Sequence, residues 1–377
     1  MKLVMTMMVR DEVDVVEAMI RFHLAQGVDT IIVTDNGSVD GTAEVLERLR
    51  GEGLVELRHD PVQRKQQGET VTSMARDAYT VFGADWVLNA DADEFWTAVD
   101  PHQTLRDAFA GISKEIQSFT IPVIDMTGNP AMTGSGLQRL SYRDLRSDEQ
   151  LKTVGLLAHS THDSAHIGDA DVVVSQGNHF VSVPSHGEPD MAHRIEVRHF
   201  PWRSWQQFSR KVDSAGRAYD GQSALKPSPN HHGMRDYRRL QEGTLFAFYV
   251  LRHPSEEDIA RGLARGEFVH DTRIADTVPS PVVDTEIDPS LAASQRRLAK
   301  TVEAQEKALA EAAAHRDEQD AELANLRREL ATTTSDLAQS ELRAESLLTE
   351  LTAERARKIV RLVNRVVETS RRLTRRP

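Results

Sequence analysis

The first 90 residues alternate short apolar runs with segments whose apolar residues recur at helical spacing. The apolar runs predict buried strands at Leu3–Val9, Thr30–Thr34, Leu54–Leu57 and Asp85–Asn89. The periodic segments predict helices at Val13–Gln26, Thr42–Arg50 and Val71–Phe82. This alternation predicts an α/β fold of Rossmann-like type, with a mainly parallel sheet and helices on both faces.

Three polar loops directly follow predicted strands, at residues 10–12, 35–41 and 90–96. In sheets of this class, ligands bind at the carboxyl edge of the strands. We therefore expect the three loops to cluster and to carry the chemistry.

The pattern changes after about residue 290, where glycine is absent and no proline occurs before Pro377. Apolar residues recur every seven positions, interrupted by Gln, Thr, Ser and Arg, in the series that start at Leu298 and Val302. A seven-residue repeat keeps one seam facing a partner helix, so residues 286–354 are predicted to form a coiled coil and a homo-oligomer. The alternative is a solitary, solvated helix.

Residues 355–377 are basic, with nine Lys or Arg against the single acid Glu368, interleaved with Ile, Val and Leu. Such an amphipathic helix can lie on an anionic membrane surface. It can equally pack on its coiled-coil partner. No membrane span is indicated.

Composition narrows the function classes. The 377 residues carry a net charge of −12, which argues against a nucleic-acid binder. The absence of cysteine excludes disulfides, thiolate zinc sites, iron–sulfur clusters and a Cys nucleophile. The apolar start is too short for a membrane span and meets Arg10-Asp11-Glu12, so we expect a mature cytoplasmic N-terminus. The basic tail allows peripheral attachment of this cytoplasmic protein to the inner face of a membrane.

The loop after the second strand reads Asp35-Asn36-Gly37-Ser38-Val39-Asp40-Gly41-Thr42. Its glycines allow a tight turn that approaches a ligand closely, and an acid at the strand end can accept hydrogen bonds from a base or ribose. An ordinary turn before a helix is the alternative. The loop matches neither the dinucleotide fingerprint nor the phosphate loop.

The acidic segment Asn89-Ala90-Asp91-Ala92-Asp93-Glu94 gives a stronger signal because it follows an apolar strand. Adjacent carboxylates repel one another unless a cation or hydrogen-bond donors compensate them. Asp91 and Asp93 can both reach one divalent ion. Their hard oxygen atoms suit Mg²⁺ or Mn²⁺, which also bind diphosphate oxygens.

Together, Met8-Val9-Arg10-Asp11-Glu12, the segment from Asp35 to Thr42 and Asp91-Ala92-Asp93-Glu94-Phe95 resemble family 2 glycosyltransferases of the GT-A fold. The resemblance covers about the first 110 residues. It continues more loosely through the segment from His199 to Phe208, which is similar to a branch of uncharacterised bacterial relatives.

The resemblance implies a nucleotide-sugar donor, a divalent metal and transfer with inversion. It places Asp35 at the nucleobase, with Asn36 in the same donor-binding loop, and Arg10 and Glu12 along the nucleotide pocket. It places Asp91 near the ribose or metal and Asp93 on the metal.

The same resemblance makes His199 a further metal ligand, with His179 as its rival and an ordinary core or surface histidine as the alternative. Arg203, Arg210 and Lys211 follow on a predicted helix. They can clamp the donor phosphate or the acceptor, and we expect Arg203 to contact the donor. They can also be the solvated face of that helix.

An inverting transferase needs a general base. The Glu-Asp pair of many relatives is absent downstream, which leaves the base open among Asp163, Glu188, Asp190 and Glu196.

We therefore expect residues 1–285 to form a glycosyltransferase unit, with a nucleotide-sugar-binding half (1–115) and an acceptor half (116–285). The expected reaction is metal-dependent sugar transfer to a hydroxyl of a cell-envelope or surface glycan or glycolipid. Two alternatives remain at this point. They are a nucleotidyl- or phosphate-group transferase on a similar fold, and a non-catalytic coiled-coil interaction protein.

Overall fold

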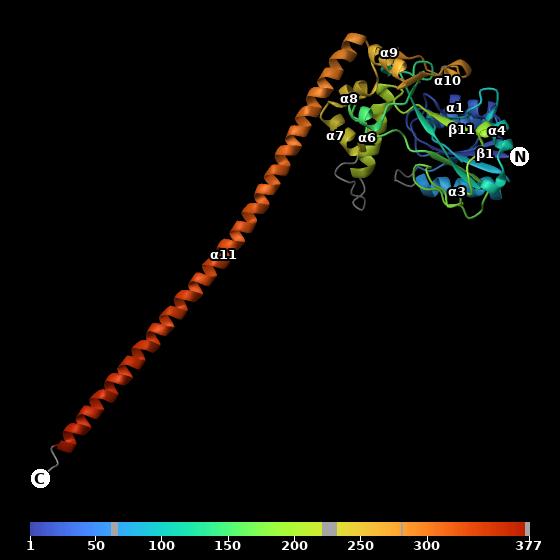
Figure 1. Cartoon of the computed structure of the whole chain (residues 1–377). Coiled ribbons are helices and arrows are strands. Elements are labelled where there is room, and N and C mark those ends of the chain that lie inside the picture. Colours follow the sequence, from blue (N-terminus) through green and yellow to red (C-terminus); the bar gives the residue numbers. More distant parts are fainter. Residues whose placement is uncertain (62–66, 221–231, 280–281, 374–377) are drawn as a thin grey trace. The chain divides into compact units, whose positions relative to one another are not determined.

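The computed structural model describes residues 1–61, 67–220, 232–279 and 282–373, and these form two compact units, Met1–Val302 and Glu303–Pro377 (Figure 1). The first unit contains all the strands described. The second consists of most of the long C-terminal helix. The observed division therefore lies beyond residue 285, inside that helix.

A six-stranded sheet forms the centre of the first unit. Its order is β3 (Glu56–His59), β2 (Thr30–Asp35), β1 (Leu3–Val9), β4 (Trp86–Asn89), β10 (Asp163–Ile167) and β6 (Ser118–Ile121). The first four strands are parallel, whereas β10 runs antiparallel to both of its neighbours. The α/β prediction is confirmed, but parallel pairing in this sheet is confined to these four strands. Strand β3 begins two residues later than its apolar run.

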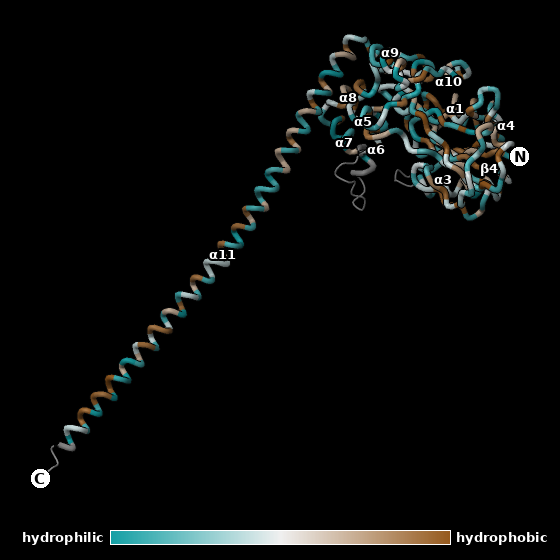
Figure 2. Tube along the Cα trace, viewed as in Figure 1, coloured by the Kyte–Doolittle hydropathy of each residue, from teal (hydrophilic) through white to brown (hydrophobic). Residues whose placement is uncertain are grey.

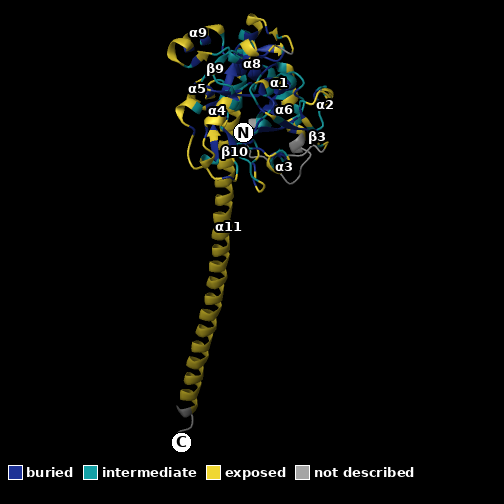
Figure 3. Ribbon diagram, turned by 90° about the vertical axis from the view of Figure 1, so that its right-hand side faces the viewer, coloured by how far each residue is buried: buried dark blue, intermediate teal, exposed yellow. Residues whose placement is uncertain are grey.

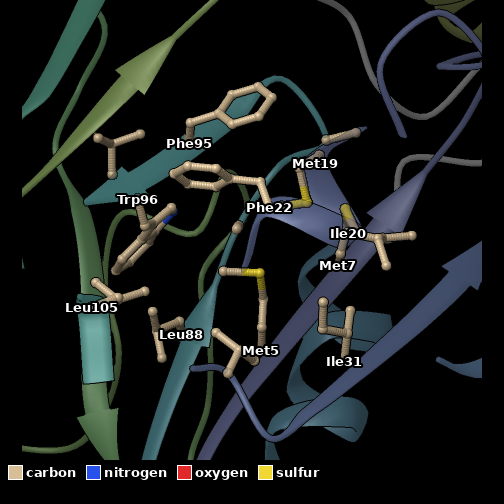
Figure 4. Packing of buried hydrophobic residues seen from close by; sticks show 14 of the residues in the cluster. Met5, Met7, Met19, Ile20, Phe22, Ile31, Leu88, Phe95, Trp96 and Leu105 are labelled. Carbon is tan, nitrogen blue, oxygen red and sulfur yellow. The ribbon is translucent and has the colours of Figure 1, made fainter. Parts of the chain in front are cut away.

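Helices cover both faces of this sheet, so alternate residues of β1 pack into two different hydrophobic cores. Leu3, Met5, Met7 and Val9 share one core with α1 (Val16–Ala25), α2 (Thr42–Gly51) and α4 (Leu105–Gly111). Val4 packs on the other face against α3 (Gln67–Thr80). Figure 4 shows the first core, where Met5 and Met7 of β1 meet Met19 and Ile20 of α1.

A second, mixed sheet has the order β12 (Phe268–His270), β9 (Tyr142–Asp144), β7 (Val123–Thr127), β11 (Ile195–His199) and β5 (Glu94–Ala98). A short pair joins β8 (Ala131–Thr133) to β13 (Thr285–Glu286). The remaining shorter helices are α5 (Asp148–Lys152), α6 (Trp205–Asp220), α7 (His232–Gln241), α8 (Leu245–Arg252), α9 (Glu256–Arg265) and α10 (Arg273–Thr277), with 3₁₀ turns at Lys114–Ile116 and Met191–His193.

Helix α11 (Pro289–Leu373) runs without a break across residue 354, where the sequence suggested a change of character. Its first turns belong to the globular unit, because Ala299 and Val302 pack with Phe248 and Leu251 of α8. Residues 314–371 are all exposed in the single chain (Figure 3). Apolar residues recur among hydrophilic ones along the helix (Figure 2). Of the basic tail, residues 374–377 lie outside the described part.

No helix in the described ranges has both the length and the apolar character that crossing a membrane requires.

Candidate functional site

The loops at the carboxyl edge of β1 and β2 contact each other, as the sequence predicted. Arg10 donates from Nη1 to the carbonyl oxygen of Asn36 at 2.9 Å, and the amide of Asp11 donates to Oγ of Ser38 at 3.0 Å. The register explains the contact, because Val9 is paired with Asp35 at the ends of the two parallel strands.

Asp35 and Asn36 occupy the end of β2, and both are buried. Oδ1 of Asp35 accepts from the amide of Ser38 at 3.2 Å, which closes the turn before α2. The Asn36 side chain donates to the carbonyl of Asp60 at 2.9 Å. These hydrogen bonds join the ends of β2 and β3, and we call the edge formed by Asp35 and Asn36 the lip.

Asp91 lies in the third loop, immediately after β4. Oδ1 of this residue accepts from Nε2 of Gln67 at 2.9 Å and from Nδ2 of Asn178 at 3.1 Å. Burial and the neighbouring charge of Asp93 raise the pKa of Asp91 above its usual value. The side chain is held by neutral amides and keeps no ion pair of its own within the described ranges.

Asp93 has a different environment, although it is only two residues away. Its carboxylate is 2% exposed, and Oδ2 lies 3.1 Å from Nζ of Lys211 and 3.2 Å from Nη1 of Arg203. Burial opposes ionisation of Asp93, but Lys211, His199 and Arg203 outweigh it and hold its pKa below the usual range. This residue is therefore a buried anion compensated by cations of the protein itself.

Arg203 is fully buried at the start of the segment that leads into α6. It donates from Nε to Oδ2 of Asp14 at 2.8 Å and also pairs with Glu12. Burial raises the pKa of Glu12 to about 7, against the opposing charge of Arg203. Through these ion pairs and its contact with Asp93, Arg203 connects the first and third loops. The expected contacts of Arg203 and Glu12 with a donor remain a prediction.

His199 ends β11 opposite Glu94 of β5. Its Nδ1 lies 2.8 Å from Oδ1 of Asp125 and 3.0 Å from Oγ of Ser160, which fixes the ring and turns Nε2 toward Oδ2 of Asp93 at 3.8 Å. Burial opposes the charged form, but the bond to Asp125 and the charge of Asp93 raise the pKa of His199 to about 9. His179, the rival ligand, instead lies near Asp163, with Nδ1 3.7 Å from Oδ1.

These contacts test the metal expectation. Within the described ranges, no cluster of three or more His, Asp or Glu side chains is arranged to hold a metal ion. Asp93 and His199 nevertheless present one oxygen and one nitrogen to a common region, and Mg²⁺ commonly uses few protein ligands beside phosphate oxygens and water. For the pair to take two positions of such a shell, His199 would have to lose its proton, and Lys211 and Arg203 would both have to release Oδ2 of Asp93.

Among the four candidates for the general base, Asp163 lies next to the acidic segment. It begins β10, which is antiparallel to β4, so the chain reversal places it at the same edge of the sheet. Burial raises the pKa of Asp163 to about 8. Burial, and after it the charge of Asp163, raise the pKa of Glu94 well above its usual value. The two residues form a buried pair of carboxyl groups.

The other three candidates lie elsewhere. Glu188 and Asp190 are exposed, and Asp190 accepts from the amides of Ala192 and His193. Glu196 forms ion pairs with Arg143 at 2.8 Å and Arg198 at 3.0 Å. None of them lines the cavity beside Asp91.

That cavity has a volume of about 550 Å³ and opens beside the acidic segment. One part of its wall is polar and contains Asp91, Glu94, His199 and Lys211. Another part is apolar and contains Leu156, Trp202, Phe208 and Val212. The Lys211 side chain is 51% exposed, so it can meet a ligand that Arg203 cannot reach.

Asp125 and its partners were not among the residues predicted from the sequence. Asp125 stands in the buried strand β7, where Oδ2 lies 3.3 Å from Nδ1 of His159. A lone acid inside the apolar run Ile121-Pro122-Val123-Ile124-Asp125-Met126 was the available signal, since a buried charge requires partners.

No family model and no curated protein matches the chain. Among solved structures, S. aureus TarS 1-349 is 14% identical over 71% of this chain and 88% of its own, with a TM-score of 0.32. The complex of TarS 1-349 with UDP-GlcNAc is 15% identical over 70% of this chain and 73% of its own, with a TM-score of 0.35. Mycobacterium tuberculosis glucosyl-3-phosphoglycerate synthase with Mn²⁺, UDP and glucosyl-3-phosphoglycerate is 14% identical over 68% of this chain and 81% of its own, with a TM-score of 0.27. Similarity at this level does not identify a reaction.

Proposed function

We propose that this chain transfers a sugar from a nucleotide-diphosphate donor to a hydroxyl group of an acceptor. The observation that supports this most directly is the environment of Asp93. A buried carboxylate meets Lys211, Arg203 and His199 at the edge of a cavity of about 550 Å³. An acid and several cations beside a cavity suit a substrate whose reaction releases a multiply charged leaving group.

Lys211 is the residue we assign to that leaving group. Breaking the bond between sugar and diphosphate leaves negative charge on the departing nucleotide, and a fixed cation that meets this charge lowers the barrier. Lys211 is held 3.1 Å from Asp93 and lines the cavity, so its ammonium group is positioned before the donor binds.

A divalent ion, Mn²⁺ or Mg²⁺, would be held by Asp93 and His199, with Asp91 nearby. When bound, it would supply further charge neutralisation at the diphosphate. Asp125 and Ser160 both contact Nδ1 of His199 and so fix the orientation of its ring. A histidine that binds a metal ion through one ring nitrogen is usually oriented in this way through the other.

The donor nucleotide would lie along the lip formed by Asp35 and Asn36, beside Arg10. Glu12 and Arg203 would position this lip and Asp93 relative to each other through their shared ion pairs. The donor sugar would then face the cavity, where the acceptor binds.

We assign the general base to the Glu94–Asp163 pair in the form in which the two carboxyl groups share a single proton, so that one of them is ionised and can accept the proton of the acceptor hydroxyl. Glu94 lines the cavity and therefore can meet an acceptor hydroxyl, whereas Asp163 stands behind it. Removal of the hydroxyl proton on the side away from the diphosphate gives a direct displacement with inversion. Glu188, Asp190 and Glu196 have no part in this assignment.

The apolar wall with Trp202 and Phe208 suits an acceptor that has both hydroxyl groups and an apolar face, such as a glycan or a glycolipid of the cell envelope. We place the enzyme in the cytoplasm. The basic end of α11 would contact the inner face of an anionic membrane.

We also propose that α11 associates with the same helix of a second copy. Leu309, Leu323, Leu330 and Leu337 follow the heptad spacing and are all exposed in the single chain. Their exposure leaves a seam that a partner helix would cover.

The testing experiment is a screen of uridine, guanosine and thymidine diphosphate sugars with and without Mn²⁺, with product analysis. Release of a nucleoside diphosphate that depends on Asp93 supports sugar transfer. Release of pyrophosphate identifies a nucleotidyltransferase instead. No turnover and no thermal shift with any donor favour the interaction protein.

A further inference from the structure

A second cavity, of about 260 Å³, lies where α9, the end of α8 and the first turns of α11 meet. These elements lie together in Figure 1. All of its lining residues belong to the globular unit. The catalytic proposal does not use this cavity.

The wall of this cavity is strongly basic. Five cationic side chains line it against two acidic ones, the cations being Arg146, Arg261, Arg265, Arg296 and Lys300 and the acids Asp258 and Glu267. We call it the basic cavity. Its positive excess contrasts with the net charge of −12 of the whole chain.

Three of the five cations are compensated by acids. Arg146 donates to Asp144 through two bonds of 2.9 and 2.6 Å. Arg261 pairs with Asp258 at 2.6 Å, and Arg265 lies 3.7 Å from Glu267. These pairs shape the wall and do not require a ligand.

Arg296 and Lys300 differ from the other three. They stand one turn apart on α11 and face the same cavity, and neither has an ion pair within the described ranges. Arg296 donates from Nη2 to the carbonyls of His253 and Pro254 at 3.1 and 3.3 Å, while its buried Nε has no partner in the described structure. The charge of Asp258 favours the Arg296 cation, but neither Arg296 nor Lys300 has a carboxylate within ion-pair distance in the described ranges. A bound anion shared by the two cations would reduce the repulsion between them.

The two cavities share a wall. Gln150, Thr153 and Val154 line the basic cavity, and the residues that follow them, 155–161, line the catalytic one. In the same way, Leu251 and His253 line the basic cavity and Arg252, between them, lines the catalytic one. Nε2 of His159, in the catalytic cavity, also lies 2.7 Å from the carbonyl oxygen of Arg146. A ligand in the basic cavity would therefore contact the same segment, residues 150–161, that borders the proposed acceptor site.

We propose that the basic cavity is a second binding site, for a phosphate group carried by a small molecule or a lipid headgroup. Arg296 and Lys300 are the two residues that bind the phosphate oxygens, and Arg261 of α9 lines the same cavity. The volume is below that of a typical drug-sized pocket, so it suits a phosphate with a small organic body. This site is independent of the sugar-transfer proposal.

The test compares the full chain with R296Q/K300Q and with the control R297Q, which removes a charge from the adjacent, exposed helix position outside the cavity. Calorimetry with inorganic phosphate and glucose 6-phosphate measures the soluble ligands. Co-sedimentation with phosphatidylcholine vesicles, with and without phosphatidylglycerol, measures the lipid source.

We expect R296Q/K300Q to lose about tenfold or more in affinity, because charge-assisted bonds to phosphate are lost. R297Q should retain the affinity of the original chain. Loss toward the soluble phosphates identifies a small molecule as the occupant, and loss toward the anionic vesicles identifies a headgroup. If R296Q/K300Q binds every probe as R297Q does, with an unchanged unfolding temperature, the site does not exist.

Discussion

Nζ of Lys211 lies 3.1 Å from Oδ2 of Asp93, although 118 positions separate the two residues. The pair joins α6 to the loop after β4 and places a cation at the cavity wall. Lys211→Gln should lower the turnover of the active donor by about 100-fold or more, comparable to the loss of one oxyanion donor in other enzymes.

The kinetic constants of donor turnover provide the measurement. Arg210→Gln is the matched control, because Arg210 precedes Lys211 on the same helix but lies near Asp40, at 4.0 Å. Equal rates in the two variants would remove Lys211 from the mechanism.

Asp93→Asn should abolish stimulation by Mn²⁺, because an amide is a poor ligand for a hard cation in place of a carboxylate. Donor turnover in a Mn²⁺ titration, and after chelation, is the measurement. Asp213→Asn is a suitable control, since Asp213 is on α6 and pairs with Arg217 at its surface. Retention of full metal-dependent activity in Asp93→Asn would contradict the assignment.

Arg203→Gln should destabilise the fold by about 3–5 kcal/mol, because it leaves buried acids without their cation. Glu12, Asp14 and Asp93 would all lose this partner. Urea unfolding gives the free energy directly. The exposed Arg194 offers the control Arg194→Gln, for which we expect no change.

Stability should fall as the pH is lowered from 6.5 to 4, in part because of His23. Burial lowers the pKa of His23 to about 4, and its Nε2 accepts from the amide of Trp96 at 3.0 Å. As the pH falls, His23 is therefore protonated in the unfolded chain at a higher pH than in the folded chain. The free energy of unfolding decreases by on the order of 3 kcal/mol across that window.

The measurement is the free energy of unfolding at several pH values for the original chain and for His23→Gln. The free energy of unfolding of His23→Gln should decrease less steeply below pH 6.5 than that of the original chain. The exposed His102 provides the control, His102→Gln, which should decline as the original chain does. Parallel curves for His23→Gln and the original chain would contradict the prediction.

Truncation after Val302 should convert an oligomer into a monomer while donor binding is retained. This end point keeps Ala292 and Ala299, which are buried against the globular unit. Ending the chain at residue 288 would expose that contact. Light scattering measures the mass of both forms, and a monomeric full-length chain would contradict the coiled-coil prediction.

Local sequence patterns were sufficient to predict the first four strands, the helices between them and the long C-terminal helix. Apolar periodicity reports which face of an element is buried, and that information is contained within each element. The same reasoning located the Asp35 loop and the acidic segment, because the carboxyl ends of parallel strands share one edge. The antiparallel strand β10 carried no such signal, so Asp163 could not be separated from three other acids.

The sequence by itself determined the first four strands, the helices between them and the long C-terminal helix, and it placed Asp35 and the acidic segment at strand ends. Only the tertiary structure decided which charges meet. Asp91 and Asp93 are two residues apart, yet one is held by amides and the other by Lys211 and Arg203. The physical reason is that a buried charge depends on groups brought near it by packing of distant segments, and spacing along the chain carries no information on that packing.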